Sequence, residues 1–390
     1  MGASTAGLLL LLPAAVLGAV HHMYVGNLAP PARAYSLRFD DVSHELAVVN
    51  NISASAPHAW IALNHDKSYL YGVSLQDPRI ASYKVRGNGT DLALAGRLAF
   101  NGSCAGKTSA FVQASSLPPY RVYTAAWPGP EACGAALAVN SSGGGGTGAV
   151  TRNTQSWRYL AASGVHGLAF GRRDNELIYS ADLNGDSVWT HKVDGPTGIV
   201  TELARLPVAK GSHPRHLAAH PNGTYLYVLM EAANRLTAYS LDAKTGVPTA
   251  EESSYYLLPK NITQTDKQYW SAEVMLSHNS RFLWATARAW VNTTNHGYVN
   301  GFLLDGDGRV AKHMFQEKTT TTGGYANAIS PAPFGDEWAA MTDVPRGYVQ
   351  MWRMTGRNET ELGVEYTGAE AVAKVDIADG GCCANVVWYD

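Results

Sequence analysis

The chain has 390 residues, of which 46% are hydrophobic and 16% are charged, and its formal net charge at pH 7 is −2. So small a charge gives no electrostatic basis for binding nucleic acid or an anionic membrane surface. The 39 glycines and 20 tyrosines suit a protein built from many short strands and tight turns. The composition therefore suits an ordinary folded protein, with neither nucleic acid nor a membrane as its partner.

The first 19 residues are typical of a secretory signal peptide. An apolar run begins at Leu8 and ends in small residues, and it is too short to cross a bilayer. No Lys or Arg precedes this run, so a buried N-terminal strand is the alternative. We predict that residues 1–19 direct the chain to the secretory pathway or the extracellular space, and that residues 20–390 form a single folded domain.

Eight Asn-x-Ser/Thr sequons agree with secretion, because eight are many for a cytosolic protein. Most of them fall in predicted turns, and one stands at the tip of a predicted hairpin. We predict glycosylation at Asn51, Asn88, Asn101, Asn140, Asn222, Asn261, Asn292 and Asn358.

Four cysteines are present, and an even number in an oxidising compartment indicates disulfides. Cys104 could pair with Cys133 and leave a bridge between Cys382 and Cys383, or each early cysteine could pair with a late one. We favour the first pattern because Cys104 and Cys133 lie within one sequence repeat. Buried free thiols are the alternative for the C-terminal pair. We expect no zinc site, since neither a Cys-x-x-Cys motif nor paired histidines at zinc spacing occur.

A strand–turn–strand unit recurs along the chain. Its clearest copy spans residues 212–236, where Asn222-Gly223 joins two β-forming runs and so marks a hairpin. Copies begin near residues 58, 108, 166, 215, 273 and 327, which are 49 to 58 residues apart. A period of that length in a β-rich chain indicates the blades of a β-propeller, which stack into one continuous domain.

The two ends of the chain are predicted to meet in one blade. Residues 22–27 should form the first strand and residues 384–389 the last, and their pairing would close the ring without exposed edges. Residues 140–156 are rich in Gly and Ser and are predicted to form an exposed insertion, either a surface loop or a lid over the channel. We expect an all-β fold of four-stranded antiparallel blades, closed by the N- and C-terminal strands.

Each repeat carries a polar residue at the start of its first strand and another at the end of its second strand. A hairpin brings these positions to the same edge of its sheet, and the innermost strands of a propeller line its central channel. The first-strand set is His166, Arg215, Glu273 and Asn327. The second-strand set, 15 or 16 residues later, is Asp182, Glu231, Arg288 and Asp343. We predict that both sets share one pocket.

These side chains suit an organic anion or a polarised carbonyl group. Arg215 and Arg288 can hold oxygens with a bidentate fork. His166 can transfer a proton near neutral pH, and Glu231 can orient its neighbours or act as the base. We predict that these four residues are catalytic. The predicted substrate-binding residues are Glu273, Asn327, Asp182, Asp343 and His216.

Structural roles are the alternative for three of the substrate-binding candidates. Asp182 and Asp343 could tie blades together through ion pairs, which mimic functional sites. His216 could stabilise the turn at which its strand begins. Since the sequence contains no Ser nucleophile elbow, phosphate-binding loop or dinucleotide fingerprint, the candidate chemistry depends on the residues of these two sets.

At these hairpins the chain resembles a known family. Two segments are similar to the lactonase-type seven-bladed β-propellers: HPRHLAAHPNGTYLYVLMEAANRLTAY and SAEVMLSHNSRFLWATAR. Two more resemble its fungal carboxy-cis,cis-muconate cyclase branch: VHGLAFGRRDNELIYSADLNGDSVW and the C-terminal GCCANVVWYD. The resemblance covers nearly the whole chain after residue 19. It implies seven blades and a cyclase without cofactor or metal, with His166, Arg215, Glu231 and Arg288 at the positions proposed as catalytic in that branch.

The predicted secretion distinguishes this chain from the muconate cyclases, which work inside the cell. Secreted, glycosylated fungal relatives include hetero-Diels–Alderases that join a tropolone quinone methide to a sesquiterpene alkene. The resemblance therefore implies a secreted, cofactor-independent ring-forming enzyme, and the predicted reaction is a hetero-Diels–Alder cycloaddition in fungal secondary metabolism. The alternatives are a lactonising cyclase, a lactone hydrolase and a non-catalytic ligand-binding propeller. The oligomeric state, monomer or dimer, is left open.

Overall fold

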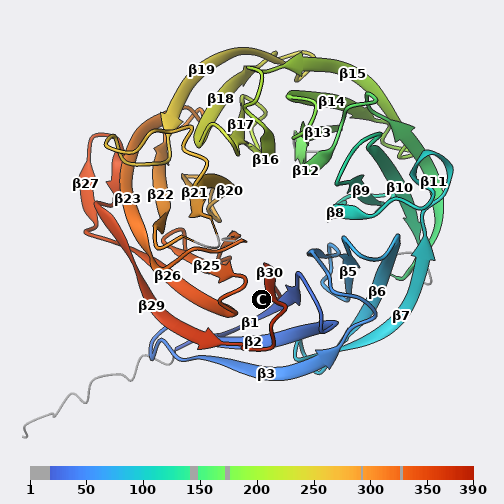
Figure 1. Cartoon of the computed structure of the whole chain (residues 1–390), viewed down its shortest axis with the longest axis horizontal. Coiled ribbons are helices and arrows are strands. Elements are labelled where there is room, and N and C mark those ends of the chain that lie inside the picture. Colours follow the sequence, from blue (N-terminus) through green and yellow to red (C-terminus); the bar gives the residue numbers. More distant parts are fainter. Residues whose placement is uncertain (1–17, 141–147, 172–175, 291–292, 326–327) are drawn as a thin grey trace, which may run out of the picture.

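The computed structural model of the chain describes residues 18–140, 148–171, 176–290, 293–325 and 328–390. Seven four-stranded antiparallel sheets stand around a central axis like the blades of a propeller (Figure 1). This arrangement confirms the predicted all-β, seven-bladed fold. No helix in these ranges is long and apolar enough to cross a membrane.

The blades follow one another around the ring in chain order (Figure 1). From the axis outward, blade 1 contains β30 (Cys382–Trp388), β1 (Val20–Asn27), β2 (Arg33–Asp40) and β3 (Leu46–Ser53). Blade 2 contains β4 (Trp60–Leu63), β5 (Tyr69–Val73), β6 (Arg79–Arg86) and β7 (Asp91–Ala99). The 3₁₀ helix η1 (Gly102–Cys104) precedes blade 3, which contains β8 (Ser109–Ala114), β9 (Val122–Ala126), β10 (Cys133–Val139) and β11 (Val150–Arg158).

The other four blades repeat this order. Blade 4 contains β12 (Val165–Gly171), β13 (Leu177–Asp182), β14 (Ser187–Val193) and β15 (Val200–Pro207). Blade 5 contains β16 (Pro214–Ala219), β17 (Tyr225–Met230), β18 (Arg235–Leu241) and β19 (Pro248–Tyr256). Blade 6 contains β20 (Tyr269–Leu276), β21 (Phe282–Ala289), β22 (His296–Leu304) and β23 (Val310–Thr322). Blade 7 contains β24 (Ile329–Pro331), β25 (Trp338–Asp343), β26 (Tyr348–Thr355) and β29 (Gly368–Asp376), and β27 (Asn358–Thr360) with β28 (Gly363–Glu365) forms a hairpin beside it.

Neighbouring blades bury their faces against each other. Each of the seven interfaces holds its own hydrophobic cluster, and the one between blades 5 and 6 includes Tyr227, Leu283 and Phe302. Every residue of β17, YLYVLM, is buried because both faces of this strand meet a neighbouring blade. The outer strand β15 is exposed over most of its length. Apolar surface removed from water between blades is therefore what stabilises the ring.

The ring is closed inside blade 1. Strand β30 pairs antiparallel with β1, with Val386 opposite Val25, and so brings the C-terminal strand to the axis. The Asn385 side chain then holds blade 2, because its amide oxygen accepts from Ile61 N (2.9 Å) and its amide nitrogen donates to Ile61 O (2.9 Å). The prediction that the terminal strands join in one blade is confirmed.

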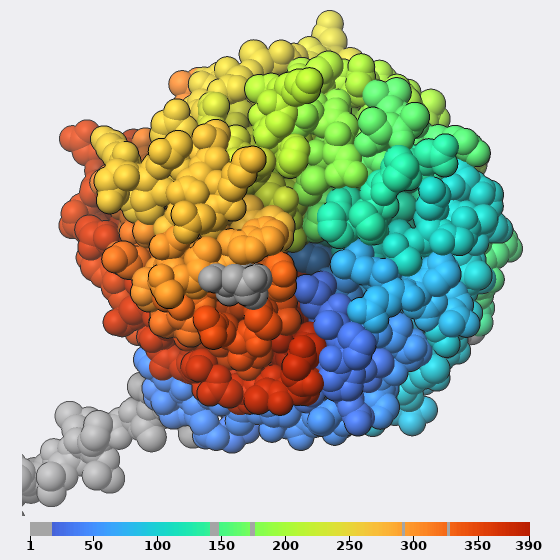
Figure 2. All heavy atoms as spheres, in the orientation of Figure 1, coloured from blue at the N-terminus to red at the C-terminus, as the bar shows by residue number. Residues whose placement is uncertain are grey.

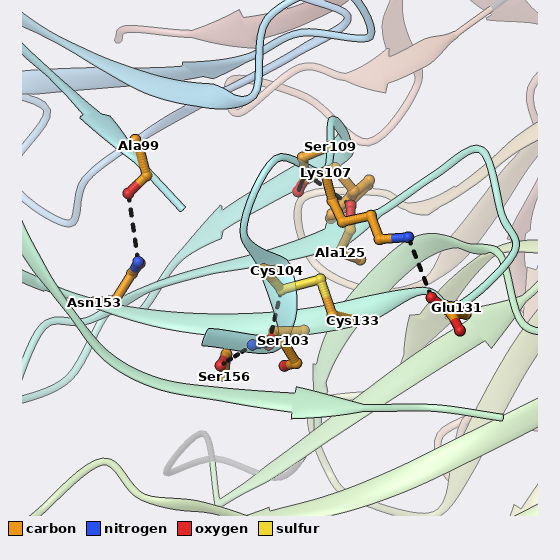
Figure 3. The surroundings of a disulfide bond; sticks show 12 residues. Ala99, Ser103, Cys104, Lys107, Ser109, Ala125, Glu131, Cys133, Asn153 and Ser156 are labelled. Carbon is orange, nitrogen blue, oxygen red and sulfur yellow. Dashed lines mark hydrogen bonds and ion pairs between the residues drawn. A yellow bond between two sulfur atoms is a disulfide. The ribbon is translucent and has the colours of Figure 1, made fainter. Parts of the chain in front are cut away.

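The four cysteines form two disulfides, Cys104–Cys133 and Cys382–Cys383, which is the favoured of the two predicted patterns. The first disulfide links η1 to β10 in blade 3 (Figure 3). The second lies at the start of β30, in the hydrophobic cluster between blades 7 and 1. All four side chains are buried.

The predicted insertion at 140–156 is too long. Val150–Arg158 forms β11, the outer strand of blade 3, and residues 141–147 lie outside the described ranges. The polar sequence VTRNTQSWR suits an outer strand, because a strand at the rim of a blade exposes one face to water. Residues 1–17 of the predicted signal peptide are likewise outside the described ranges, and β1 begins at Val20.

Seven of the predicted glycosylation sites are exposed asparagines: Asn51, Asn88, Asn101, Asn140, Asn222, Asn261 and Asn358. The turn between β16 and β17 carries Asn222, whose Oδ1 accepts a hydrogen bond from Thr224 N (3.1 Å). Asn292 lies outside the described residues. Glycan attachment at all eight sites stays a prediction.

Replacing both Cys104 and Cys133 by Ala removes a cross-link between residues 29 positions apart. We expect the free energy of unfolding, measured with urea, to fall by about 3–4 kcal/mol through the lost loop-closure entropy. The matched control is Cys382→Ala with Cys383→Ala, because that pair is equally buried but closes no loop. An equal loss in both double variants would show that packing, and not the cross-link, stabilises blade 3.

Candidate active site

A pocket lies on the propeller axis where the innermost strands begin, and we call it the axial pocket. Its wall contains three of the predicted catalytic residues, His166, Arg215 and Arg288, together with Trp60 and Asn385. His166 is the second residue of β12 and Arg215 is the second residue of β16, so equivalent positions of two blades face the same space. Figure 2 shows the molecule hollowed near the centre of the ring.

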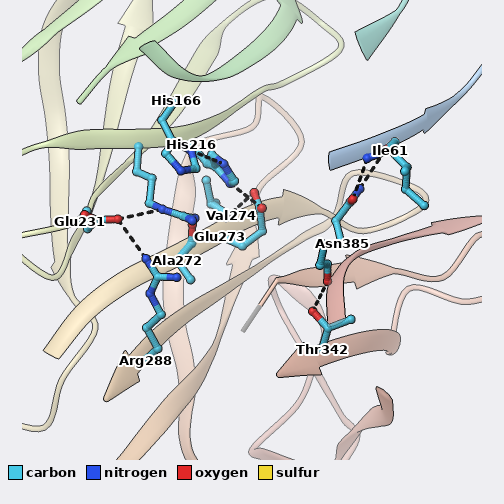
Figure 4. A network of polar contacts seen from close by, with 12 residues as sticks. Ile61, His166, His216, Glu231, Ala272, Glu273, Val274, Arg288, Thr342 and Asn385 are labelled. Atoms are coloured by element: carbon cyan, nitrogen blue, oxygen red, sulfur yellow. Dashed lines mark hydrogen bonds and ion pairs between the residues drawn. The ribbon is translucent and has the colours of Figure 1, made fainter. Parts of the chain in front are cut away.

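Glu231 holds both arginines of the axial pocket. It follows β17 directly, and its Oε2 lies 2.8 Å from Arg215 Nε and 3.1 Å from Arg288 Nη2 (Figure 4). The contact with Arg215 Nε is an ion pair without hydrogen-bond geometry, but another nitrogen of Arg215 donates to the carbonyl of Ala272. Two cations share one carboxylate, so the trio carries one excess positive charge. The axial pocket therefore favours an anionic or strongly polarised oxygen.

Burial acts on the charge of both arginines. It lowers the pKa of Arg288 to about 9, with a further contribution from the charge of Arg215 and opposition from Glu231. Burial also lowers the pKa of Arg215, which Glu231 and Glu273 oppose. The guanidinium carbon of Arg288 lies 3.9 Å from the centre of the Trp270 ring, a cation–π contact that stabilises its charge. Among the described residues the buried Arg288 Nε has no hydrogen-bond partner.

A line of three buried side chains runs from the axial pocket to blade 6. His166 Nδ1 lies 3.0 Å from His216 Nε2, and His216 Nδ1 lies 2.5 Å from Glu273 Oε2 (Figure 4). The exposed fractions of these residues are 9%, 1% and 3%. The ring of Trp60 stands edge-on to His216 with the centroids 4.9 Å apart. The three side chains therefore hydrogen-bond to one another while almost entirely buried.

Each member of this line is kept neutral by its surroundings. Burial, followed by the charge of Arg215, lowers the pKa of His166 and of His216 well below the usual value. Burial raises the pKa of Glu273 to about 8, although the charge of Arg215 opposes the shift. Both shifts favour uncharged imidazoles and a protonated Glu273 carboxyl. The short contact between Glu273 and His216 is then a hydrogen bond that satisfies two buried polar groups.

The structure brings six of the predicted site residues together: His166, Arg215, His216, Glu231, Glu273 and Arg288. Asn327 lies outside the described residues. Over the described ranges, no group of three or more His, Cys, Asp or Glu side chains is arranged to hold a metal ion. A reaction without metal or cofactor stays a prediction.

Two predicted substrate-binding residues are placed elsewhere. Asp182 is the last residue of β13 and is fully buried, and its Oδ1 accepts from Gly164 N and Gly185 N, both at 2.9 Å. The Oδ2 of Asp343 accepts from the Tyr348 hydroxyl (3.2 Å) inside blade 7. The described wall of the axial pocket contains neither carboxylate. The prediction that they face the axis is therefore wrong for the described wall. Donors of blade 4 satisfy both oxygens of Asp182. Asp343 Oδ2 is held by Tyr348 and by Thr321 of β23, while Asp343 Oδ1 has no partner among the described residues.

Reasoning from the sequence missed the aromatic side chains around the pocket. Trp270, Trp290 and Tyr325, here called the aromatic rim, have ring centroids 4.5 to 6.1 Å apart. Trp127 stands 5.1 Å from His166, ring centre to ring centre. Trp127 follows β9 and Trp290 follows β21, as Glu231 follows β17. The first position after the second strand of a blade is the signal that could have predicted Trp127 and Trp290.

Comparisons with known proteins agree with this architecture. A family model described as "Lactonase, 7-bladed beta-propeller" matches residues 22–324. The chain is 31% identical to the carboxy-cis,cis-muconate cyclase of Neurospora crassa over 387 residues, which cover 95% of this chain and 100% of that protein. It is 28% identical to muconate cycloisomerase 1 of Cutaneotrichosporon cutaneum, over 84% of this chain and 89% of that protein.

A solved structure shows the same fold at lower sequence identity. The periplasmic gluconolactonase of Pseudomonas aeruginosa matches with a TM-score of 0.75 and 15% identity, covering 95% of this chain and 99% of that one. The family model spans most of the chain, and the Neurospora protein aligns over nearly all of it. The chain therefore belongs to the lactonase family of seven-bladed β-propellers.

Proposed function

We propose that this protein is an enzyme that closes a ring on an unsaturated organic acid or carbonyl compound, without a metal or organic cofactor. The observation that carries the proposal is that Arg215, Arg288 and the neutral His166 converge on the axial pocket. Oxygen-binding donors and a proton-transfer group then act on one substrate. The names of two similar proteins, a muconate cyclase and a muconate cycloisomerase, support a cyclase or isomerase reaction.

The two arginines bind the substrate oxygen and stabilise charge that develops on it. Glu231 fixes both guanidinium groups before the substrate arrives, so they need little reorganisation when negative charge builds up. The low exposure of the two side chains, 11% for Arg215 and 5% for Arg288, strengthens this interaction, because water screens it less. Holding the two reacting ends of the substrate in contact contributes a further rate increase.

His166 moves the proton. In a lactonising ring closure, a carboxylate oxygen forms a bond with one carbon of a double bond, and the neighbouring carbon takes up a proton. His166 lines the axial pocket, and its Nδ1 is engaged by His216, which leaves Nε2 for the substrate. The hydrogen-bonded line behind His166 favours a reaction with proton transfer. Lactonising ring closure is therefore the reaction that the geometry supports best.

A hetero-Diels–Alder cycloaddition is the second candidate, and the aromatic rim favours it. Trp290 and Tyr325 are 38% and 37% exposed, and Tyr325 lines the axial pocket. Such rings can pack against an apolar, unsaturated partner. A cycloaddition needs two partners held close together and donors aimed at an oxygen, which Arg215 and Arg288 supply. His166 or Glu231 would assist the dehydration that forms the diene.

Secretion with N-glycosylation is part of the proposal. It is supported by the apolar run in residues 1–19 and by the exposure of the seven described sequon asparagines. A glycan on an exposed turn or outer strand leaves the contacts between blades untouched. The enzyme would then meet its small organic substrate outside the cytosol.

Arg288→Ala removes a buried donor from the axial pocket, and we expect kcat for ring closure to fall by about 100-fold or more. The assay offers polyene acids, lactones and quinone methide precursors to purified protein without added metal or cofactor, and products are followed by chromatography. Arg353→Ala is the matched control, because Arg353 also stacks on a tryptophan, 5.0 Å from the centre of the Trp338 ring, but lies outside the axial pocket. Wild-type rates in Arg288→Ala would refute the proposed site.

Trp290→Ala tests the second candidate reaction. We expect KM to rise about tenfold, or about 1.4 kcal/mol, for substrates with an extended apolar body, and to stay unchanged for small dicarboxylic acids. Tyr256→Ala is the control, since Tyr256 is 58% exposed on the outer strand β19. Unchanged KM values for both substrate classes would remove the support that the aromatic rim gives to cycloaddition.

Expression of the whole chain in a fungal host tests secretion. We expect protein in the medium that begins after residue 19 and loses mass when N-glycans are removed enzymatically. Asn358→Gln should remove the mass of one glycan, because Asn358 is exposed at the start of β27. An unglycosylated chain that stays in the cytosol with residues 1–19 attached would contradict this part of the proposal.

A further inference from the structure

A second pocket lies further along the propeller axis, and we call it the distal pocket. Its wall is formed by middle and end residues of the inner strands, among them Phe111, Leu168 and Met275. The axial pocket is lined by residues at the starts of the same strands. The inner strands run from one pocket to the other, so the two pockets face opposite ends of the channel. Met275 is 37% exposed, which places solvent at the distal end.

A hydrogen bond joins the wall of the axial pocket to the wall of the distal pocket. His166 belongs to the wall of the axial pocket, whereas His216 and Glu273 belong to the wall of the distal pocket. The bond that joins these walls is the 3.0 Å contact between His166 Nδ1 and His216 Nε2. The ring of Trp60, which lines both pockets, closes the space beside this contact.

We propose, on the basis of the function proposed above, that Glu273, His216 and His166 relay a proton from the distal pocket to the substrate in the axial pocket. His166 is the member that touches the substrate. His216 and Glu273 act through it, as positioning residues that also supply the proton. The relay assigns a function to His216 and Glu273, two buried titratable groups that have no direct contact with the substrate in the proposed ring closure.

The proton movements balance with both imidazoles neutral throughout. Before the reaction, the Glu273 O–H donates to His216 Nδ1, and His216 Nε2–H donates to His166 Nδ1. When the substrate carbon takes the proton from His166 Nε2, the His216 Nε2 proton moves to His166 Nδ1 and the Glu273 proton moves to His216 Nδ1. Three N–H or O–H bonds break, two N–H bonds and one C–H bond form, and the negative charge appears on Glu273. A proton from water in the distal pocket then restores the carboxyl group. Both imidazoles, now protonated on Nδ1, regain their starting tautomers by proton exchange with water after the product has left the axial pocket.

The stoichiometry of ring closure requires a supply of protons to the substrate. A substrate carboxylate that adds to a double bond consumes one proton from solvent in each turnover. The substrate fills the axial pocket while this happens, so water cannot deliver the proton from that side. The distal pocket provides the other route for the proton. From there the proton passes through Glu273 to His216, whose Nδ1 lies 2.5 Å from Glu273 Oε2.

The surrounding charges favour this transfer over formation of an imidazolium ion. Arg215 and Arg288 face His166 and His216 and oppose a positive charge on either ring. The same two arginines favour the carboxylate form of Glu273 after it gives up its proton. Glu231 is paired with both arginines and reduces these effects without reversing them. The relay therefore starts from a protonated carboxyl, since burial raises the pKa of Glu273 to about 8.

Glu273→Gln tests the relay in the full-length protein, because glutamine has nearly the same size but no proton to transfer. We expect kcat to fall by about 100-fold with an unchanged KM. Wild-type kcat should be retained below pH 8 and should fall above it, as the reserve carboxyl of Glu273 loses its proton at a pKa of about 8. The variant should lose this basic limb of the pH profile, which a purely structural role would leave in place.

Infrared difference spectroscopy gives a readout that needs no substrate. The wild type should show a carboxylic-acid C=O band that disappears as the pH rises through about 8, and Glu273→Gln should lack it. Asp343→Asn is the matched control: burial raises the pKa of Asp343 to about 7, and Asp343 lies outside the relay. That variant should lose only the band that titrates near pH 7.

The outcomes separate the relay from the proposed function. Wild-type kcat and an unchanged basic limb in Glu273→Gln would overturn the relay, as would the absence of the infrared band in the wild type. A large loss of ring closure in Arg288→Ala would still support the proposed function in that case. Failure of the wild type to close any ring would overturn the proposed function itself.

Discussion

Closure of the ring is the constraint on which the rest of the structure depends. A blade of this propeller has apolar residues on both faces, so it cannot bury them alone and needs a neighbour on each side. The pairing of β30 with β1 supplies the last two interfaces, and Asn385 then fastens blade 1 to Ile61 of blade 2. Only a closed ring brings residues as far apart in sequence as His166 and Arg288 to one axis.

The axis holds titratable groups away from water in two different ways. In the first, charges are paired: Glu231 contacts two arginines and offsets part of their desolvation cost. In the second, the groups stay neutral: His166, His216 and Glu273 satisfy one another through hydrogen bonds. The two arrangements lie side by side in Figure 4. Together they place a cationic oxygen site next to a proton-transfer site, which is the combination that ring closure requires.

The similarity to other propellers limits what the fold alone says about activity. Gluconolactonases and muconate cyclases match this chain over most of its length, so one architecture carries different reactions. The differences must lie in the side chains around the axis. For this protein the distinguishing features are the Arg–Glu–Arg trio, the neutral line behind His166 and the aromatic rim.

The sequence by itself determined the features that depend on residues close together in the chain. The repeat period indicated blades, the Asn222-Gly223 turn set a hairpin, and the register of that hairpin predicted that Arg215 and Glu231 would meet. A shared repeat was also enough to favour the Cys104–Cys133 disulfide.

Only the tertiary structure decided the contacts between blades. The hydrogen bond of His166 to His216 and the approach of Tyr325 to Trp270 and Trp290 depend on how each blade is rotated and displaced about the axis. Residues about fifty positions apart become neighbours there, and the repeat does not say which side chain turns towards the axis and which turns into its own blade. That choice depends on which donors each buried group finds, and those donors are positioned by the packed ring.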